Sequence, residues 1–445
     1  PGKSLNGIHG VGVPGLVKGV LEMHQNFGKL SRKEVIKPAI DLAQKGFSVY
    51  PHLARALKKR ARVLKQFPST TKIFFQDGKP LQVGDKLIQK DLAQTLGLIS
   101  KHGEKAFYQG EIAKKIVATS KKYKGPLIAE DFKVYNTKWR ESVVQEFGKY
   151  KIFAMSPPSS GGVHIIQMLN ILQHANLKNY TPLDPQYLHL LASSMQHVFA
   201  DRAKYLGDTD FVDVPLKKLI SKDYAGKIWK HIDKEKAMSA SQIRKRPLIV
   251  EESNDTVHFT VMDSEGNSVT TTQTVNGLMG SGLVAQGTGI VLNNEMDDFT
   301  VKVGSLNLFG AVGGEKNTIW PEKRPLSSMS PTMVFQNNKP MLALGTPSGT
   351  RIISCITQTL SNYLNFNLPL DQAIGMNRIH HQWIPNFLYV DDEGLPAQTR
   401  MALQEKGHKL INKSLGCRVQ AIELKDGKLW GVADPRGQEG RALGK

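Results

Sequence analysis

The chain has 445 residues, which is enough for one large domain or two ordinary ones with a substantial core. Hydrophobic residues make up 40% and charged residues 22%, as in soluble globular proteins, and no apolar run is long enough to span a membrane. The formal charge of +20 is spread along the chain, and its densest run, residues 55–66, lacks interleaved aromatic residues that would stack bases. We therefore expect a solvated helix face there, no nucleic-acid partner and no stable membrane insertion.

Cysteine and histidine usage gives no sign of a metal site. Cys355 and Cys417 are too few for a disulfide framework or for the usual kind of zinc site. Two cysteines do not indicate whether the protein lies in a reducing or an oxidising compartment. His380 and His381 have no third ligand at metal spacing, so we expect them to be structural and expect no metal.

The first 235 or so residues are predicted to be mostly helical. Apolar residues recur at helical spacing in residues 31–47 and 186–208. Between them, residues 149–172 pass from a strand through a turn of proline, serine and glycine into a helix. Residues 10–15 match a dinucleotide-binding fingerprint by letter, but no strand precedes them, so we interpret them as an ordinary glycine turn.

The polar, unpatterned residues 237–255 are predicted to form an exposed linker. Beyond them, short strands alternate with glycine-rich turns. Residues 333–347 are predicted to form a hairpin, residues 351–364 a helix, and another hairpin turns at residues 426–427. This order fits an α+β fold in which two layers of sheet are flanked by helices and the linker joins two interleaved halves.

The run DTVHFTVMDSEGNSVTTTQTVNG, residues 255–277, is predicted to form a β-hairpin that turns at residues 264–266. Because side chains alternate along a strand, one face of this hairpin carries the opposed pairs Thr256–Thr274, His258–Thr272, Thr260–Thr270 and Met262–Ser268. Threonine favours strands, so such a face is often simply the solvated side of an edge hairpin. The alternative interpretation is that these hydroxyls belong to a site.

Three later stretches are polar where a core would be apolar, namely residues 292–299, 323–332 and 345–351. The last one lies between a predicted strand and a helix, so its backbone N–H groups should point toward a group at the helix N-terminus. Together with Thr256 they fit the chemistry of an N-terminal threonine, whose hydroxyl attacks an acyl carbonyl while the free α-amine takes the proton. Only cleavage before Thr256 would create that amine.

The chain resembles the γ-glutamyltranspeptidases, a family of N-terminal nucleophile hydrolases, along essentially its whole length. The stretches that carry the resemblance are GVPGLVKG, KPAIDLAQKGF, PPSSGGVHIIQMLNIL, ADRAKYLGD, DTVHFTVMD, LNNEMDDF, KRPLSSMSPT and NRIHHQWIP. The resemblance implies a four-layer αββα sandwich and a precursor that cuts itself between Asp255 and Thr256. Residues 1–255 would form the large-subunit portion, mostly helical and ending in the 237–255 linker, and residues 256–445 the small catalytic subunit. The family's large subunit also has an N-terminal part, with an arginine for the substrate carboxylate, that is absent from this chain.

The resemblance also implies roles for individual residues. Thr256 would be the nucleophile and Thr274 the threonine that hydrogen bonds it, so the hydroxyl-rich face is better interpreted as part of an active site. The backbone N–H groups of Ser348 and Gly349 would form the oxyanion hole. The ammonium of the substrate would be bound by Asn276, Glu295 and Asp298, and its α-carboxylate by Ser327 and Ser328. Phe309 would form the lid. Many members have glycine in place of Ser348, and many bacterial members have tyrosine in place of Phe309.

The implied activity is hydrolysis or transfer of the γ-glutamyl group of glutathione and other γ-glutamyl compounds. The expected acceptors are water, amino acids and dipeptides, the subunits would stay together as a heterodimer, and no cofactor is expected. Such proteins are usually exported, which implies a periplasmic or secreted protein whose signal peptide is not present in this sequence. One alternative is a related acylase for glutaryl-type amides such as cephalosporin side chains, whose substrates lack the amino group that Glu295 and Asp298 would bind. Another is an unprocessed, inactive basic protein that binds anionic surfaces.

Overall fold

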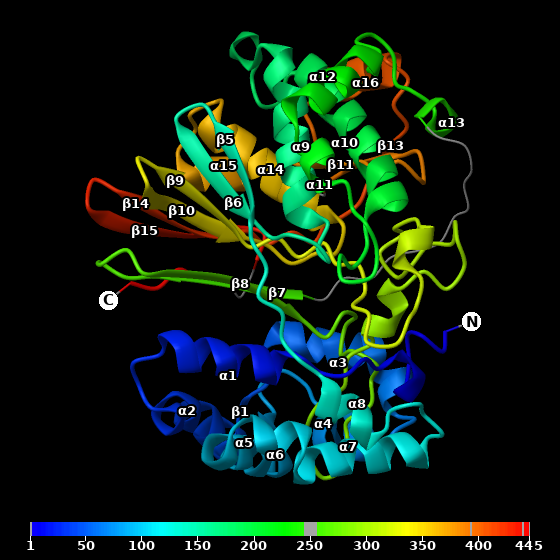
Figure 1. Ribbon diagram of the computed structural model, residues 1–445, viewed down its shortest axis with the longest axis vertical. Helices are drawn as coiled ribbons and strands as arrows, with labels where there is room; N and C mark the ends of the chain where they lie inside the picture. Colours follow the sequence, from blue (N-terminus) through cyan, green and yellow to red (C-terminus); the bar gives the residue numbers. More distant parts are fainter. Residues whose placement is uncertain (1, 244–255, 392–393, 438–439, 445) are drawn as a thin grey trace. The chain divides into compact units, whose positions relative to one another are not determined.

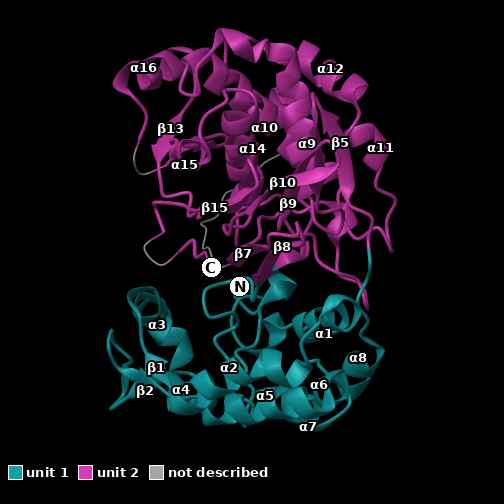
Figure 2. Ribbon diagram, turned by 90° about the vertical axis from the view of Figure 1, so that its left-hand side faces the viewer, with its two compact units in different colours: residues 1–139, 274–297 teal, residues 140–273, 298–445 magenta. Residues whose placement is uncertain are grey.

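The computed structural model describes residues 2–243, 256–391, 394–437 and 440–444. The chain forms two compact units (Figure 2). Unit 1 comprises residues 1–139 and 274–297, and unit 2 comprises residues 140–273 and 298–445. Among the described residues, no helix is both long and apolar enough to cross a membrane.

Unit 1 is mainly helical, as expected. Its elements are α1 (Leu16–Phe27), α2 (Arg32–Lys45), α3 (Pro51–Leu64), α4 (Pro68–Phe74), α5 (Lys90–His102), α6 (Glu104–Tyr108), α7 (Glu111–Lys122), α8 (Ala129–Val134), the 3-10 helix η1 (Ile8–Gly10) and the short strands β1 (Phe47–Ser48), β2 (Phe75–Gln76), β3 (Lys79–Pro80) and β4 (Lys86–Leu87). The predicted helix at 31–47 begins at a capping box, in which Ser31 and Glu34 satisfy each other's backbone N–H groups. Leu283 and Leu292 are fully buried in the same core as Phe107 and Ile112. Burial of these leucines therefore attaches the late segment 274–297 to the early helices.

Unit 2 is built on a six-stranded antiparallel sheet in the order β15-β14-β10-β9-β6-β5. The strands are β5 (Val143–Phe147), β6 (Tyr150–Ala154), β9 (Thr332–Gln336), β10 (Lys339–Gly345), β14 (Gln420–Lys425) and β15 (Lys428–Ala433). The hairpins predicted at residues 333–347 and about residues 426–427 are confirmed. Their two-residue turns, Asn337-Asn338 and Asp426-Gly427, have positive φ at both positions, which is the backbone that matches the strand twist in a tight hairpin.

One face of this sheet is covered by helices, and the β7–β8 hairpin lies on the other face (Figure 1). The helices of unit 2 are α9 (Gly161–Leu172), α10 (Pro185–Tyr205), α11 (Leu216–Leu219), α12 (Lys222–His231), α13 (Ala240–Ile243), α14 (Arg351–Leu364), α15 (Leu370–Gly375) and α16 (Ala397–Glu405). The hairpin consists of β7 (Thr256–Met262) and β8 (Ser268–Thr274), and a separate small sheet consists of β11 (Ile379–His380), β12 (Leu388–Val390) and β13 (Leu410–Asn412). Every residue of α9 is buried because this helix packs against the sheet, α10, α12 and α14. The predicted α+β class with two layers of sheet is thus confirmed.

Strands from both halves of the sequence are interleaved in the large sheet. Strand β6 pairs with β9 from Tyr150↔Gln336 to Ala154↔Thr332, so a hydrogen-bonded ladder joins residues before and after position 256. The compact units do not follow that position either, since unit 1 takes in 274–297 and unit 2 begins at 140. Of the predicted linker 237–255, the structure describes only 237–243, which includes the one-turn helix α13.

Candidate active site

The β7–β8 hairpin has the predicted register. The backbone N–H of Asp263 donates to the Asn267 carbonyl at 3.0 Å across the turn. His258 Nδ1 lies 2.8 Å from Thr272 Oγ1, and the hydroxyls of Thr260 and Thr270 are 3.1 Å apart. Continued to the open end of the hairpin, the same register places Thr256 opposite Thr274, which are the first residue of β7 and the last of β8.

The hydroxyl-rich face of the hairpin is turned toward the large sheet. The His258 ring lies over Gly345 at the end of β10, where an added Cβ would come 2.1 Å from the imidazole. Burial of this ring lowers the pKa of His258 to about 4, so it is neutral at neutral pH. On the opposite face Val257 and Val261 are exposed. Interpreting the hydroxyl-rich face as the solvated side of an edge hairpin is therefore wrong.

The loop of residues 346–350, which connects β10 to α14, is the second part of the candidate site. Ser348 has a φ of 120° and Gly349 a φ of 54°, and the Ser348 side chain is fully buried. Among the described residues, no acceptor is within hydrogen-bonding reach of the backbone N–H of either Ser348 or Gly349. Two adjacent backbone donors before the N-terminus of a 14-residue helix suit a developing negative charge.

Phe309 packs directly on this loop. A Cβ added to Gly349 would lie 2.2 Å from the Phe309 ring, so only glycine fits at this position. Gln382 also connects the two segments, because its side chain donates to the Gly310 carbonyl at 3.0 Å and accepts from the Thr350 hydroxyl at 3.0 Å. The residue predicted to be the lid is thus in contact with the predicted oxyanion loop.

Asp298 closes the short 3-10 helix η4 (Glu295–Asp298), which Glu295 opens. The Asn307 side chain donates to one carboxylate oxygen of Asp298 at 2.9 Å, and the Asn317 side chain donates to its backbone carbonyl at 2.7 Å. Asp298 belongs to unit 2, whereas Glu295 and Asn276 belong to unit 1.

Asn276 is held in a left-handed backbone conformation with a φ of 71°. Its backbone N–H donates to Thr274 Oγ1 at 2.8 Å, and its side-chain nitrogen donates to the Asn294 carbonyl at 3.0 Å. The second bond orients the side-chain amide, whose oxygen can accept a hydrogen bond. An amide oxygen is a neutral acceptor of the kind that an ammonium ion can use.

Ser327 and Ser328 lie beside the turn that precedes α9. Both the backbone N–H and the hydroxyl of Ser160 donate to the Ser327 carbonyl, each at 2.8 Å. Arg202 donates to the Ser328 hydroxyl at 3.3 Å through Nη2 and to the Ser160 hydroxyl at 3.0 Å through Nε. The predicted carboxylate-binding serines are thus backed by a guanidinium.

Arg202 is the residue of this cluster that the sequence analysis missed. Its side chain is buried, and in the described part of the chain it forms no ion pair within 4.0 Å. Burial lowers the pKa of Arg202 to about 10, although the charge of Asp298 opposes this shift, so the guanidinium is still charged at neutral pH. The signal was present in the sequence: the consecutive charged residues Asp201 and Arg202 directly follow the apolar residues Val198, Phe199 and Ala200 in a buried stretch of α10, where charges are rare unless they are partnered.

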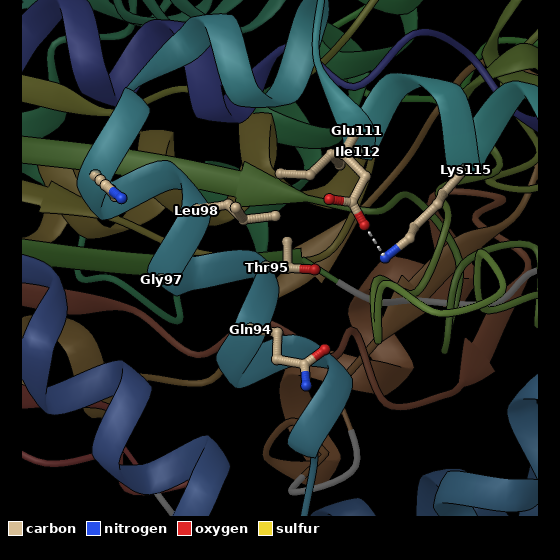
Figure 3. A pocket seen from close by; sticks show the side chains of 8 residues that line it. Gln94, Thr95, Gly97, Leu98, Glu111, Ile112 and Lys115 are labelled. Atoms are coloured by element: carbon tan, nitrogen blue, oxygen red, sulfur yellow. Dashed lines mark ion pairs between the residues drawn. The ribbon is translucent and has the colours of Figure 1, made fainter.

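The histidines expected to be structural are buried and hydrogen bonded. His380 contacts the Ser354 hydroxyl at 2.8 Å and the Gln382 side chain at 3.0 Å. A separate surface pocket of about 400 Å³ is lined by residues of α5 and α7, including the ion pair Glu111–Lys115 at 2.6 Å (Figure 3). That pocket contains none of the predicted catalytic or substrate-binding residues.

Comparison with known proteins identifies the family. Residues 1–444 match the family described as gamma-glutamyltranspeptidase. The chain belongs to this family. The glutathione hydrolase proenzyme of Escherichia coli strain K12 is 40% identical over 436 residues, which cover 98% of this chain and 75% of that protein. As a γ-glutamyltranspeptidase family member, the chain is an enzyme of the N-terminal nucleophile hydrolase class.

Solved structures agree on the fold of this γ-glutamyltranspeptidase family member. A cephalosporin acylase from Bacillus halodurans superposes with a TM-score of 0.84 at 25% identity, covering 97% of this chain and 78% of that one. The γ-glutamyltranspeptidase of Helicobacter pylori superposes with a TM-score of 0.54 at 41% identity over 55% of this chain and 70% of that one. These neighbours confirm the fold of the N-terminal nucleophile hydrolases, in which helices flank two layers of sheet.

Proposed function

We propose that this γ-glutamyltranspeptidase family member cleaves the γ-glutamyl amide bond of glutathione and related compounds through an ester on Thr256. Two observations support the assignment. The hairpin register places Thr256 opposite Thr274, and the backbone N–H groups of Ser348 and Gly349 in the buried 346–350 loop have no acceptor among the described residues. A nucleophile, a second hydroxyl and an oxyanion site are the parts that acyl transfer needs.

Self-cleavage would prepare the nucleophile. The Thr256 hydroxyl attacks the carbonyl carbon of Asp255, the peptide nitrogen leaves as the free α-amine of Thr256, and water hydrolyses the resulting ester. Asp255 itself lies outside the described residues. The products would be a large subunit of residues 1–255 and a small subunit of residues 256–445. They would stay together as a heterodimer because the β6–β9 ladder and the shared core of unit 1 join residues from both.

Catalysis would then proceed in two acyl-transfer steps. The α-amine of Thr256 takes the proton of the Thr256 hydroxyl while its oxygen attacks the γ-carbonyl carbon of the substrate. The negative charge on the tetrahedral intermediate is stabilised by the backbone N–H groups of Ser348 and Gly349. The leaving amine receives the proton, and a γ-glutamyl ester remains on Thr256. Water, an amino acid or a dipeptide then attacks the ester carbon and releases the acyl group.

The two ends of the γ-glutamyl group would be recognised by groups of opposite charge. Its ammonium would be bound by Asp298 and Glu295, with the side-chain oxygen of Asn276 as a neutral acceptor. Its α-carboxylate would be bound by the hydroxyls of Ser327 and Ser328. Behind them, Arg202 would supply the positive charge that a buried carboxylate requires.

The Cys355–Cys417 disulfide supports the proposal that the protein is periplasmic or secreted. Two cysteines are too few for a disulfide framework, but Cys355 and Cys417 do pair with each other, which their positions in the sequence did not predict. Disulfides persist mainly in oxidising compartments outside the cytosol. Fractionation of the native source, with the active heterodimer found in the cytosol alone, would contradict export.

One assay separates the proposed function from its alternatives. Full-length protein is examined by intact mass and N-terminal sequencing, and is then given γ-glutamyl and glutaryl anilides in parallel. The proposal predicts two chains, a small subunit that begins at Thr256, and preferential release of aniline from the γ-glutamyl compound. Preference for the glutaryl compound would identify a glutaryl-type acylase instead. A single intact chain without activity would identify the unprocessed basic protein.

A further inference from the structure

The segment Leu415–Arg418 contacts the 346–350 loop at two points. The backbone N–H of Arg418 donates to Thr346 Oγ1 at 2.7 Å, and the Ser348 hydroxyl donates to the Leu415 carbonyl. These bonds lie on either side of Pro347, and all four residues that form the contacts lie in unit 2. The loop is therefore fixed before and after the bend that presents its backbone N–H groups.

The same segment is covalently bound to the helix that follows the loop. Cys417 forms a disulfide with Cys355 in the second turn of α14, 62 residues away in sequence. Both cysteines are fully buried. Asp391 holds the segment from another direction, because its carboxylate accepts a hydrogen bond from the Leu415 N–H at 3.0 Å and is paired with Arg436 at 3.2 Å.

The loop needs such support because of the residue at its centre. Ser348 has a φ of 120°, a strained backbone region that residues with a Cβ rarely adopt and that persists only where the surroundings enforce it. The hydrogen bond from its side chain to Leu415 is a contact that glycine at this position would not make. The buried hydroxyl thus holds the strained peptide in place instead of contacting substrate.

We infer that the Leu415–Arg418 segment, locked by the Cys355–Cys417 disulfide, is a positioning device that aims the N–H groups of Ser348 and Gly349 at the oxyanion. This inference rests on the proposed function, since it gives those N–H groups the role of oxyanion donors. Neither cysteine touches substrate; both act through the loop. Because donors must lie within a few tenths of an ångström of the oxyanion to be effective, breaking the lock should lower the rate of chemistry more than substrate affinity.

The test compares the variants Cys355→Ala, Cys417→Ala and the double variant with the parent. Rates are measured only on fully processed heterodimer, counted by active-site titration, so that slow self-cleavage does not lower the apparent kcat. We expect each variant to lose about tenfold in kcat, with KM changed less than about twofold, since a misplaced oxyanion donor costs up to about 100-fold. The double variant should equal the single ones, because all three remove the same bond.

Two further variants test the segment without touching the disulfide. Thr346→Val keeps the shape of threonine but removes the acceptor for the Arg418 N–H, and it should also lower kcat while leaving KM nearly unchanged. Ile171→Ala, a fully buried change in α9, serves as a control that lowers stability elsewhere in unit 2. At a temperature well below unfolding, this control should keep the parental kcat even when its Tm has fallen as far as that of the cysteine variants.

The outcomes separate this inference from the proposed function. Cysteine variants that lose Tm but keep the parental kcat would show that the disulfide is only structural. Alkylation of denatured but unreduced parent enzyme should modify neither cysteine, and two modified thiols in fully active enzyme would also overturn the inference. A parent enzyme without γ-glutamyl activity would instead refute the proposed function.

Discussion

Replacement of Thr274 by valine tests whether the hairpin register gives the nucleophile a second hydroxyl. Valine preserves the shape and strand propensity of threonine and deletes only the hydroxyl group. In the structure, Thr274 Oγ1 accepts a hydrogen bond from the Asn276 backbone N–H at 2.8 Å. The hydroxyl is therefore an acceptor toward Asn276, and its own hydrogen can be donated to Thr256, which the register places opposite.

Two separate losses set the expected magnitude. Removing a neutral hydrogen bond to the nucleophile costs about 0.5–1.5 kcal/mol, or roughly two- to twelvefold in rate. The buried N–H of Asn276 also loses its acceptor, a penalty of about 1–3 kcal/mol that is relieved if Asn276 shifts. Because Asn276 is proposed to bind the substrate ammonium, this shift should appear as weaker binding. We expect acylation to slow by about an order of magnitude or somewhat more, together with a higher KM and slower self-cleavage.

Single-turnover acylation by a γ-glutamyl anilide, together with the rate of precursor conversion on gels, measures both effects. Thr274→Ser retains the hydroxyl and should stay within a few-fold of the parent. Thr270→Val removes a hydroxyl from the same face, where it contacts Thr260 at 3.1 Å, and should leave acylation nearly unchanged. Parental rates for Thr274→Val in both assays would refute the inference that Thr274 hydrogen bonds the nucleophile. A folded but fully inert Thr274→Val would show that Thr274 does more than position the nucleophile.

Four further predictions follow from the same residues. Thr256→Ala should remain a single chain without turnover, and N-terminal sequencing of the parent should find Thr256 first in the small subunit; another start would contradict the assignment. Asp298→Ala should self-cleave normally but lose about 1.5–3 kcal/mol of substrate stabilisation, because a buried ammonium loses a charged partner. If this variant hydrolysed a γ-glutamyl anilide at the parental rate, the ammonium site would be misplaced. Arg202→Met should raise KM for γ-glutamyl substrates by about tenfold, and an equal rise for an analogue without the α-carboxylate would exclude recognition of that group. Burial holds the folded-state pKa of His258 at about 4, below its usual value of 6.5. Between these pH values the unfolded chain binds more protons than the folded one, so stability should fall as the pH drops. Calorimetric scans at pH 7 and pH 5 measure this loss of stability, and His258→Gln should reduce it.

The sequence predicted the parts of this structure that depend on local pattern. Helix α14 has the predicted bounds 351–364, because its apolar spacing lies between a glycine-rich loop and a polar turn. The hairpin register was predictable since a short turn containing Gly266 fixes every opposed pair on its two strands. The pairing of Thr256 with Thr274 could therefore be predicted from the sequence.

Features that depend on packing between distant segments could not be predicted in the same way. Pairing of β6 with β9 and the inclusion of residues 274–297 in unit 1 leave no local signal in the sequence. The residue pattern of a segment is the same whichever distant segment it packs against. The position of Arg202 in the candidate site could not be predicted from the sequence for the same reason. Its charge was visible in the sequence, but its position behind Ser328 depends on how α10 packs against the turn before α9.

Ser348 shows how a departure from the family pattern is accommodated by a change elsewhere. Many family members have glycine at this position, so Ser348 adds a side chain to the loop. In the structure the hydroxyl is turned away into the protein, where it donates to Leu415, while Gly349 leaves room for the Phe309 ring. The strain of a positive φ at Ser348 is thus offset by a hydrogen bond from the same residue, and the disulfide fixes the acceptor of that bond. Ser348 and the Cys355–Cys417 disulfide are best understood as one adaptation of the 346–350 loop, because the serine hydroxyl needs the Leu415 carbonyl that the disulfide holds in place.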